Sequence, residues 1–319
     1  MYNSPTHKEI IEAVDRTWPK ILGIKYDIPL PPKNEILELL NYVLTNNEFE
    51  FNNIIFKQRC GIPMGNPMSP SLADIRMFEI ISKILDLFQF KNNITHLSIY
   101  RDDGFVLFDS SEDNLMTFFD IANTIHPLIK FTHEISSESI QFLDITVFKG
   151  ERWEKMQILD VKLYRKPTDN FQYLERTSTH PTSVFKGFIT AEIIRFRRSC
   201  NNLKDFNKEV QHFKSKLLKR GHYENEIDNI ITNTTKRERK QTLKYNYKNK
   251  KAASPLVFAT RFNPAFKGIG RALRKHWHLF EQNRNTKTLF PKPPIIAYKR
   301  HKNLKEYLTN FKMENNVII

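Results

Sequence analysis

Two runs of strand-forming residues, 98–100 and 105–108, flank the acidic sequence Arg101-Asp102-Asp103-Gly104. Apolar, β-branched and aromatic residues favour strands, and an Asp-Gly pair favours a tight turn. The stretch therefore predicts an antiparallel hairpin in which the glycine supplies the unusual backbone angle. Asp102 and Asp103 would stand at its tip, where two negative charges repel one another unless a cation lies between them. Taken alone, an ordinary solvent-facing Asp-Gly turn is the simpler interpretation.

A glycine- and proline-rich segment, residues 60–70, runs directly into an apolar stretch, residues 71–88, that predicts a helix. Such a stiff loop exposes backbone N–H groups and ends at a helix N-terminus, where the helix dipole favours phosphate. A phosphate or nucleotide is one predicted ligand, and a proline-rich structural turn is the alternative. Asp102 follows Pro70 by 32 residues, after one predicted helix and one predicted strand. The loop and the acidic hairpin can therefore meet at one site.

The charge of the chain divides along its length. Residues 1–150 carry 13 Lys and Arg against 20 Asp and Glu, a net −7, whereas residues 151–319 carry 37 against 15, a net +22. An acidic half with adjacent carboxylates and a strongly basic half suit a metal-using site beside a surface that binds a polyanion. The alternative is a basic domain whose lysines only keep it soluble, but a difference this large favours nucleic acid as the partner.

Composition narrows the class further. With 40% hydrophobic and 12% aromatic residues, the chain has a globular rather than a disordered composition. Its two cysteines, Cys60 and Cys200, are too few for a disulfide framework or a four-thiolate zinc site, and they are predicted to be reduced and structural. No apolar run reaches 18 residues and the first residues lack a signal-peptide core, so we expect a soluble intracellular protein with no membrane contact.

The remaining pattern predicts an α+β fold. Thr6 and Glu9 form a capping box ahead of the first helix, and Asn52-Asn53 fits a hairpin turn with positive φ at both residues. Predicted helices cover residues 8–18, 34–45, 71–88, 113–125, 183–201, 203–220, 224–232 and 264–280. Predicted strands lie within residues 49–56, 130–135, 139–148, 156–164 and 255–262.

Two basic segments are candidates for binding nucleic acid. Residues 183–201 form an amphipathic pattern in which a solvated face explains the apolar residues but not the excess of Lys and Arg. Residues 236–251 hold eight basic residues against one acidic residue, with Tyr245 and Tyr247 among them. This run predicts a flexible linker, a phosphate-binding arm whose tyrosines stack on bases, or a nuclear-import signal. The predicted contacts are Lys186, Arg195, Arg197, Arg198, Lys236, Arg237, Arg239 and Lys240.

Several motifs resemble the reverse transcriptase family. Gly-x-Pro-x-Gly-x-Pro-x-Ser-Pro at residues 61–70 and Tyr-x-Asp-Asp at residues 100–103 are similar to two conserved blocks of its palm. Met64 stands where most reverse transcriptases have glutamine, a form that resembles the Penelope-like retroelements. Further similar blocks are Phe-Leu-Asp at 142–144, Tyr-Arg-Lys-x-Thr at 164–168, Ser-x-His-Pro at 178–181, and residues 272–277 and 297–304. The resemblance covers nearly the whole chain.

The resemblance implies a right-hand polymerase. Its expected parts are a palm over residues 1–166, a helical thumb-like domain over 167–235, a basic linker over 236–254 and a small basic module over 255–319. The implied activity is RNA-directed DNA polymerisation, with an RNA template, a DNA primer and dNTPs as partners. This nucleotidyl transfer uses two ions, Mg²⁺ or Mn²⁺, held by oxygen ligands. Asp102 is the expected direct ligand and catalytic residue, and Asp103 is expected to support it.

Other positions receive roles from the same resemblance. Gly65, Asn66 and Pro67 are expected to line the nucleotide and template pocket, and Tyr100 is expected beneath the turn near the primer end. The expected primer-grip residues are Phe142, Leu143 and Asp144.

Two departures from the family pattern bear on activity. Arg101 stands where small or apolar residues are common, and its guanidinium is expected either to contact a phosphate or to weaken metal binding. The third carboxylate of the family's site precedes a segment resembling Tyr2-Asn3-Ser4-Pro5, so we expect it, like the fingers, upstream of Met1. The family's GIY-YIG endonuclease is likewise not found before Ile319. Asp15 and Asp27 lie outside the right context, and impaired activity is the expectation for this chain.

Two alternatives remain open. The chain is either a polymerase or a non-catalytic nucleic-acid-binding remnant whose acidic turn is idle. A weaker hypothesis is that residues 183–201 and their neighbours form a helix-turn-helix that reads DNA sequence. A nuclear location fits all of these hypotheses.

Overall fold

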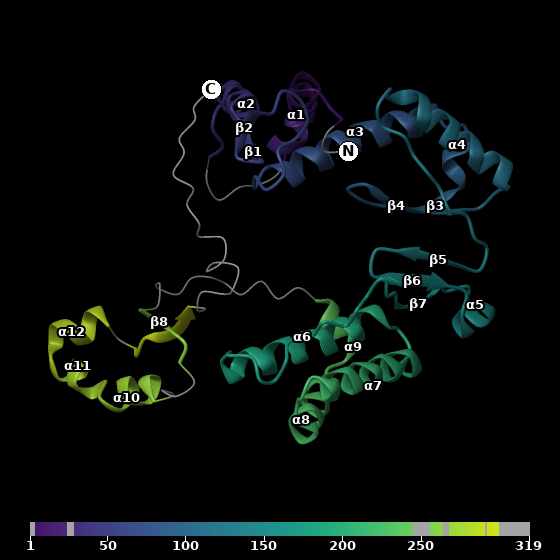
Figure 1. Ribbon diagram of the computed structural model, residues 1–319. Coiled ribbons are helices and arrows are strands. Elements are labelled where there is room, and N and C mark those ends of the chain that lie inside the picture. The colour runs from purple at the N-terminus through teal and green to yellow at the C-terminus, as the bar shows by residue number, and fades with distance from the viewer. Residues whose placement is uncertain (1–3, 24–28, 245–255, 264–267, 291, 300–319) are drawn as a thin grey trace. The chain divides into compact units, whose positions relative to one another are not determined.

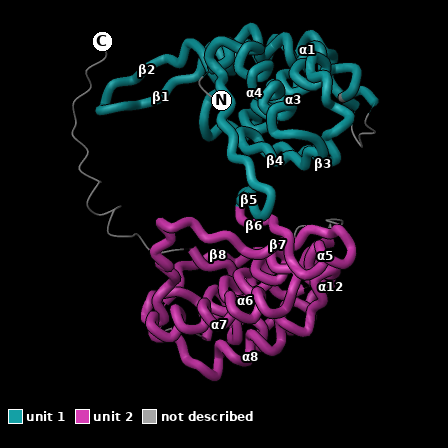
Figure 2. The backbone as a smooth tube through the Cα atoms, turned by 90° about the vertical axis from the view of Figure 1, so that its right-hand side faces the viewer, with its two compact units in different colours: residues 1–143 teal, residues 144–319 magenta. Residues whose placement is uncertain are grey.

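The computed structural model describes residues 4–23, 29–244, 256–263, 268–290 and 292–299 (Figure 1). Helices and small sheets are mixed along the chain, in agreement with the predicted α and β content. The chain divides into two compact units, residues 1–143 and residues 144–319 (Figure 2). The division therefore falls before residue 166, where the sequence predicts the end of a palm.

The first unit begins with two helices, α1 (His7–Leu22) and α2 (Lys33–Thr45). The predicted capping box starts α1, because the Thr6 amide donates to Glu9 at 2.8 Å and the Glu9 amide donates to the Thr6 hydroxyl at 3.2 Å. The helix continues through Pro19 and ends four residues later than predicted. Apolar side chains of both helices pack with the start of α3 (Ser69–Leu87) in one core: Ile10, Val14, Leu40, Leu44, Ile62, Leu72 and Ala73.

A hairpin follows α2, made of β1 (Glu48–Phe51) and β2 (Ile54–Lys57). As predicted, Asn52 and Asn53 both have positive φ, at 52° and 62°, and connect the strands as a two-residue turn. All eight strand residues are exposed.

The second core of the first unit lies between α3 and α4 (Glu112–Ile125), against which β3 (Ile94–Tyr100) and β4 (Asp103–Phe108) pack through their apolar residues. The short 3-10 helix η1 (Lys91–Asn93) leads into β3. Phe88 is 2% exposed and its ring contacts those of Phe108 and Phe118. Ser111 caps α4 by accepting from the Asn114 amide. Two helices thus support one face of the acidic hairpin.

Residues 130–135 do not form the predicted strand. The Asn123 side chain of α4 accepts from the Phe131 amide at 2.8 Å and donates to the Phe131 carbonyl at 3.2 Å. A side-chain amide thus takes both hydrogen-bonding groups that a ladder would need. Residues 139–148 form two strands rather than one, because the chain turns at Leu143, where φ is +53°. These strands are β5 (Ser139–Phe142) and β6 (Ile145–Phe148).

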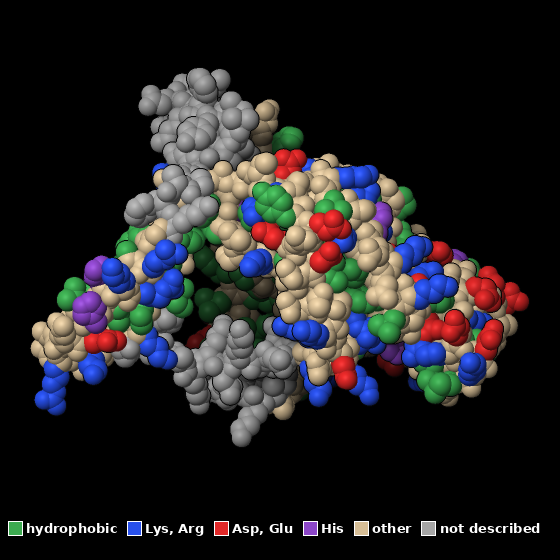
Figure 3. Space-filling model, turned by 90° about the horizontal axis from the view of Figure 1, so that it is seen from below, with side chains coloured by type: hydrophobic (Ala, Val, Ile, Leu, Met, Phe, Trp, Pro, Cys, Tyr) green, Lys and Arg blue, Asp and Glu red, His purple; other side chains and the backbone are tan. Residues whose placement is uncertain are grey.

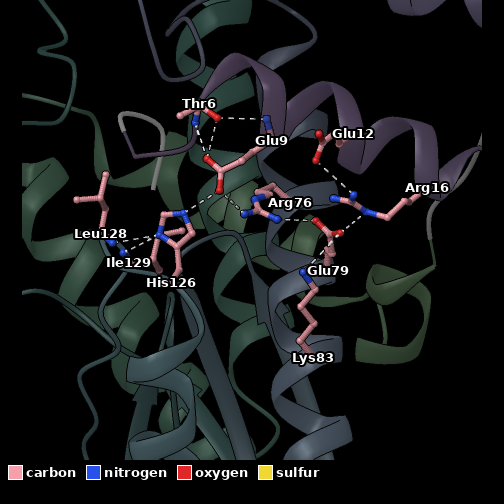
Figure 4. A network of polar contacts seen from close by, with 10 residues as sticks. All are labelled: Thr6, Glu9, Glu12, Arg16, Arg76, Glu79, Lys83, His126, Leu128 and Ile129. Atoms are coloured by element: carbon pink, nitrogen blue, oxygen red, sulfur yellow. Dashed lines mark hydrogen bonds and ion pairs between the residues drawn. The ribbon is translucent and has the colours of Figure 1, made fainter.

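A polar network ties α1, α3 and the end of α4 together (Figure 4). Besides capping α1, Glu9 accepts from the Arg76 guanidinium at 2.8 Å and contacts His126 Nε2 at 3.1 Å. The Leu128 and Ile129 amides both donate to His126 Nδ1 at 3.2 Å, so the ring hydrogen lies on Nε2 and is donated to Glu9. The second face of the network is Glu79, which accepts from Arg76 at 2.6 Å.

The second unit opens with a small antiparallel pairing of β6 with β7 (Asp160–Leu163), separated by α5 (Glu151–Met156). The strand predicted over 156–164 is thus shorter. Three helices follow at nearly the predicted positions: α6 (Thr182–Ser199), α7 (Leu203–Lys219) and α8 (Glu224–Thr235). Their shared core includes Ile193, Phe196, Phe213, Leu217 and Ile227, each completely buried.

The predicted basic linker is helical where it is described. Helix α9 (Arg239–Leu243) packs against α6, whereas residues 245–254, with Tyr245 and Tyr247, lie outside the described residues. The last part has β8 (Val257–Arg261) parallel to β9 (Ile295–Lys299), with α10 (Ile269–Lys275), α11 (His278–Gln282) and α12 (Arg284–Leu289) between them. The predicted helix 264–280 is therefore divided. Most of the family-like segment 297–304 also lies outside the described residues.

Candidate functional site

The acidic hairpin forms as predicted, with a different turn. Tyr100 pairs with Asp103 and Ile99 pairs with Gly104, so the loop consists of Arg101 and Asp102 alone. Arg101, rather than the glycine, has the positive φ, at 58°. The expectation that Gly104 supplies the unusual angle is therefore wrong, because the strands pair one residue closer to the tip and place the glycine inside the ladder.

Both carboxylates of the hairpin face solvent. Asp102 lies in the turn and Asp103 begins β4, and both residues are exposed. Neither side chain has a hydrogen bond or an ion pair with any residue that the structure describes. The Arg101 guanidinium lies over the Tyr100 ring, 5.2 Å from its centroid, so it does not neutralise the neighbouring carboxylates. The Tyr100 ring is itself 52% exposed.

These carboxylates match part of a magnesium site. Carboxylate oxygens are hard ligands of the type that Mg²⁺ takes, and two unpaired groups at a turn retain their charge for a cation. Within the described parts of the chain, no group of three or more His, Cys, Asp or Glu residues is placed to hold a metal ion. The described residues thus supply two ligands of the expected set, Asp102 and Asp103.

The glycine-proline loop enters α3 with its own hydrogen bonds largely satisfied. Gly61 and Gly65 have positive φ, at 82° and 92°. Asn66 accepts from the Met68 amide at 3.1 Å, and the buried Ser69 hydroxyl donates to the Pro63 carbonyl. Gly65 and Pro67 are exposed and Asn66 is partly exposed. The loop belongs to the same unit as the acidic hairpin, and no hydrogen bond between described residues joins the two.

The three predicted primer-grip residues lie at the boundary of the two units. In the first unit, the Phe142 ring lies 5.6 Å from that of Phe105, a residue of the acidic hairpin, and Leu143 is 41% exposed. In the second unit, the Asp144 carboxylate accepts from Arg195 of α6 at 3.3 Å. Asp144 therefore has a charged partner within the helical unit.

The predicted basic contacts on α6 have different surroundings. Lys186 is exposed. Arg195 is paired with Glu192 at 2.9 Å and with Asp144, and although burial lowers the pKa of its guanidinium, these two carboxylates raise the pKa overall. The Arg197 guanidinium lies over the Phe206 ring at 5.4 Å, and the Arg198 Nε donates to the Thr242 carbonyl at 2.6 Å.

The basic residues at the start of the predicted linker also divide. Lys236, Arg237 and Lys240 are exposed. Arg239 is half-buried and donates twice to the Arg198 carbonyl, at 3.2 and 3.0 Å. Burial lowers the pKa of Arg239, and the positive charges of Arg197 and Arg152 lower it further.

Sequence reasoning did not single out the polar group beside this cluster. Asp160 is 4% exposed and accepts from Arg152 and from the Asn201 side chain. Burial raises the pKa of Asp160, but these two donors lower it overall. The one sequence signal is an aspartate at the head of the short strand Asp160–Leu163, and its partners become visible only once α5 and the turn after α6 are folded.

Residues 172–232 match the family model of the animal helix-turn-helix domain. No curated protein matches the chain. The matched segment contains α6, α7 and most of α8, and the turn from α7 to α8 contains Gly221 with φ at +75°. This supports the predicted helix-turn-helix and, with it, nucleic-acid binding. Among the described residues, no helix has the length and apolar character needed to cross a membrane.

The third helix of this domain is acidic. In the three-helix variant of the helix-turn-helix motif, the third helix reads the DNA major groove. Helix α8 holds that position in the chain order, yet it carries Glu224, Glu226 and Asp228 and no Lys or Arg. Lys214 of α7 binds two of these carboxylates, at 2.8 and 2.7 Å. Negative charge on this helix opposes approach to DNA phosphates.

Proposed function

We propose that the chain is the palm and thumb-like part of an RNA-directed DNA polymerase of Penelope-like type. The observation that carries this proposal is the geometry of the acidic hairpin. A two-residue turn between paired strands presents Asp102 and Asp103 to solvent without an ion-pair partner, and helices α3 and α4 pack against these strands. Two exposed carboxylates on a supported hairpin suit nucleotidyl transfer better than they suit a structural turn.

The residues of the chain would contribute binding and positioning. Asp102 would be the direct ligand of Mg²⁺ or Mn²⁺ and Asp103 would support it. When bound, these ions activate the primer hydroxyl and neutralise charge on the leaving pyrophosphate. The exposed Tyr100 ring, with the Arg101 guanidinium over it, offers a flat cationic surface for a base or a phosphate. Gly65, Asn66 and Pro67 would line the nucleotide and template side.

The basic second unit would bind the RNA template and DNA primer. Residues 144–319 carry 38 Lys and Arg against 16 Asp and Glu, a net +22. Lys and Arg side chains are spread over the face of the molecule in Figure 3. Phosphate contacts of this kind hold a duplex without reading its sequence, which suits a polymerase that must copy any template.

A non-catalytic nucleic-acid-binding function is the second candidate. The helix-turn-helix match at residues 172–232 favours it, because that match supports binding and says nothing of nucleotide transfer. The two candidates differ at the hairpin, since only the polymerase needs Asp102.

Primer extension on an RNA template with Mg²⁺ or Mn²⁺ separates them. The polymerase predicts extension that Asp102→Asn abolishes. The binding protein predicts salt-sensitive binding of the same template, no extension, and no effect of Asp102→Asn on affinity.

A further inference from the structure

The C-terminal end of α6 is joined to α9 by two reciprocal sets of hydrogen bonds. Arg239 of α9 donates to the Arg198 carbonyl, and Arg198 Nε donates to the Thr242 carbonyl. Thr242 is 6% exposed, so the junction is packed rather than a loose surface contact. This fixes the position of Arg239 relative to the neighbouring side chain of Arg197.

Arg197 has an unmet hydrogen-bonding group at this junction. Its guanidinium lies over the Phe206 ring, and its Nη1 is buried with no hydrogen-bond partner in the described structure. A buried guanidinium nitrogen without an acceptor is costly, and such groups commonly have a water or an anion as the missing partner. No carboxylate among the described residues is ion-paired with Arg197.

A third guanidinium, that of Arg152, adds to the positive charge. Arg152 uses Nε on Asp160 and Nη2 on the Leu159 carbonyl. Arg152 and Arg197 are both close enough to Arg239 for their charges to act on it. Asp160 is the carboxylate paired with this group, and it is shared with Asn201. Three cations with one engaged carboxylate leave an excess of positive charge.

Capping alone does not explain the group. Arg239 could serve simply to satisfy a carbonyl at the end of α6, and cations near a helix C-terminus are favourable. That accounts for Arg239, but it leaves the buried Arg197 nitrogen unpaired and places two more positive charges nearby at a cost. The exposed Arg237 and Lys240 extend the same basic surface.

We infer that the junction of α6 and α9 binds a phosphate group of a nucleic-acid backbone through Arg197 and Arg239, with Arg152 beside them. A phosphate oxygen accepts from guanidinium groups in a bidentate manner and would offset the excess charge. The inference rests on the nucleic-acid binding proposed above and locates it away from the acidic α8. Binding at this site would be independent of sequence.

Fluorescence anisotropy with labelled single-stranded RNA and a labelled RNA–DNA duplex, titrated at several salt concentrations, tests this. Arg197→Gln keeps part of the side chain that covers Phe206 but removes the charge. We expect it to weaken binding of both probes several-fold and to lower the salt slope by about one, and adding Arg239→Gln to weaken binding further. Arg197→Lys should retain most of the affinity.

The matched control is Lys204→Gln, which removes one exposed charge from α7 in the same unit. Far-UV circular dichroism and thermal melting establish that the variants are folded. If Lys204→Gln weakens binding as much as Arg197→Gln, or if Arg197→Gln binds like the wild type, the phosphate site is wrong while nucleic-acid binding stands. If the wild-type chain binds neither probe, the binding function fails and the site with it.

Discussion

At the scale of single residues, the first unit depends on a few buried charges that each have several partners. Glu79 accepts from Arg16 Nε at 2.5 Å and from Arg76 at 2.6 Å, and its side chain is 14% exposed. Burial alone would raise the pKa of Glu79, but the two arginines outweigh it and lower the pKa below 4.5. Lys83 also approaches Glu79, but at 4.0 Å and with 56% exposure.

Glu79→Gln should lower the free energy of unfolding at neutral pH by about 1–3 kcal/mol, because charged hydrogen bonds are lost in a mostly buried position. A lowered folded pKa means that the carboxylate stabilises the fold above its unfolded pKa of 4.5, and that this stability is lost as the pH falls through the folded pKa. The variant should therefore lose less stability than the wild type on acidification. Urea unfolding at a series of pH values measures both effects. Lys83→Ala is the control and should change stability by less than about 0.5 kcal/mol; equal losses for the two variants would contradict the account.

Arg101 carries a backbone cost at the tip of the acidic hairpin, since φ is +58°. Arg101→Gly should raise the free energy of unfolding by about 0.5–1 kcal/mol relative to Arg101→Ala, because glycine adopts this angle without a Cβ clash. Both variants lose the guanidinium over Tyr100, so the comparison isolates the backbone. Chemical denaturation of the two proteins gives the difference, and a less stable glycine variant would show that the turn is not strained.

At the scale of elements, the sequence predicted the local structures and missed the ones set by distant partners. The capping box of α1, the Asn52-Asn53 turn and the helices of the second unit follow from residues a few positions apart. The absent strand at 130–135 and the packing of α9 depend on contacts with Asn123 and Arg198, which no local pattern reveals. The acidic pair at 102–103 was found from the sequence, whereas the Arg152–Asp160 pair was not, because α5 and β7 bring it together.

Helix α8 tests whether the helix-turn-helix reads DNA sequence. Asn225 and Asn229 are exposed and lie one turn apart on this helix, where base contacts would be made. Because α8 is acidic, we expect Asn225→Ala with Asn229→Ala to leave affinity for several unrelated duplexes unchanged. Arg197→Gln should weaken binding to all of them in parallel. Anisotropy with a panel of sequences measures this, and loss of preference for one sequence in the asparagine variant would restore groove reading by α8.

At the scale of the whole molecule, charge and fold divide at nearly the same place. Residues 1–143 carry 12 Lys and Arg against 19 Asp and Glu, a net −7, and hold the acidic hairpin, while residues 144–319 hold the helix-turn-helix and the basic surface. Each unit has buried clusters of its own. This separation suits a protein in which one unit binds metal and nucleotide and the other binds the nucleic acid.

The central claim is that Asp102 serves nucleotide transfer, and primer extension tests it most directly. The chain should be expressed together with whatever residues its gene encodes on the N-terminal side, so that a third carboxylate can take part. Asp109→Asn is the matched control, since Asp109 is an exposed aspartate just beyond the same strand, β4. The account predicts Mg²⁺- or Mn²⁺-dependent extension of a DNA primer on an RNA template, retained in Asp109→Asn and lost in Asp102→Asn, with template affinity unchanged. Extension that survives Asp102→Asn would contradict it.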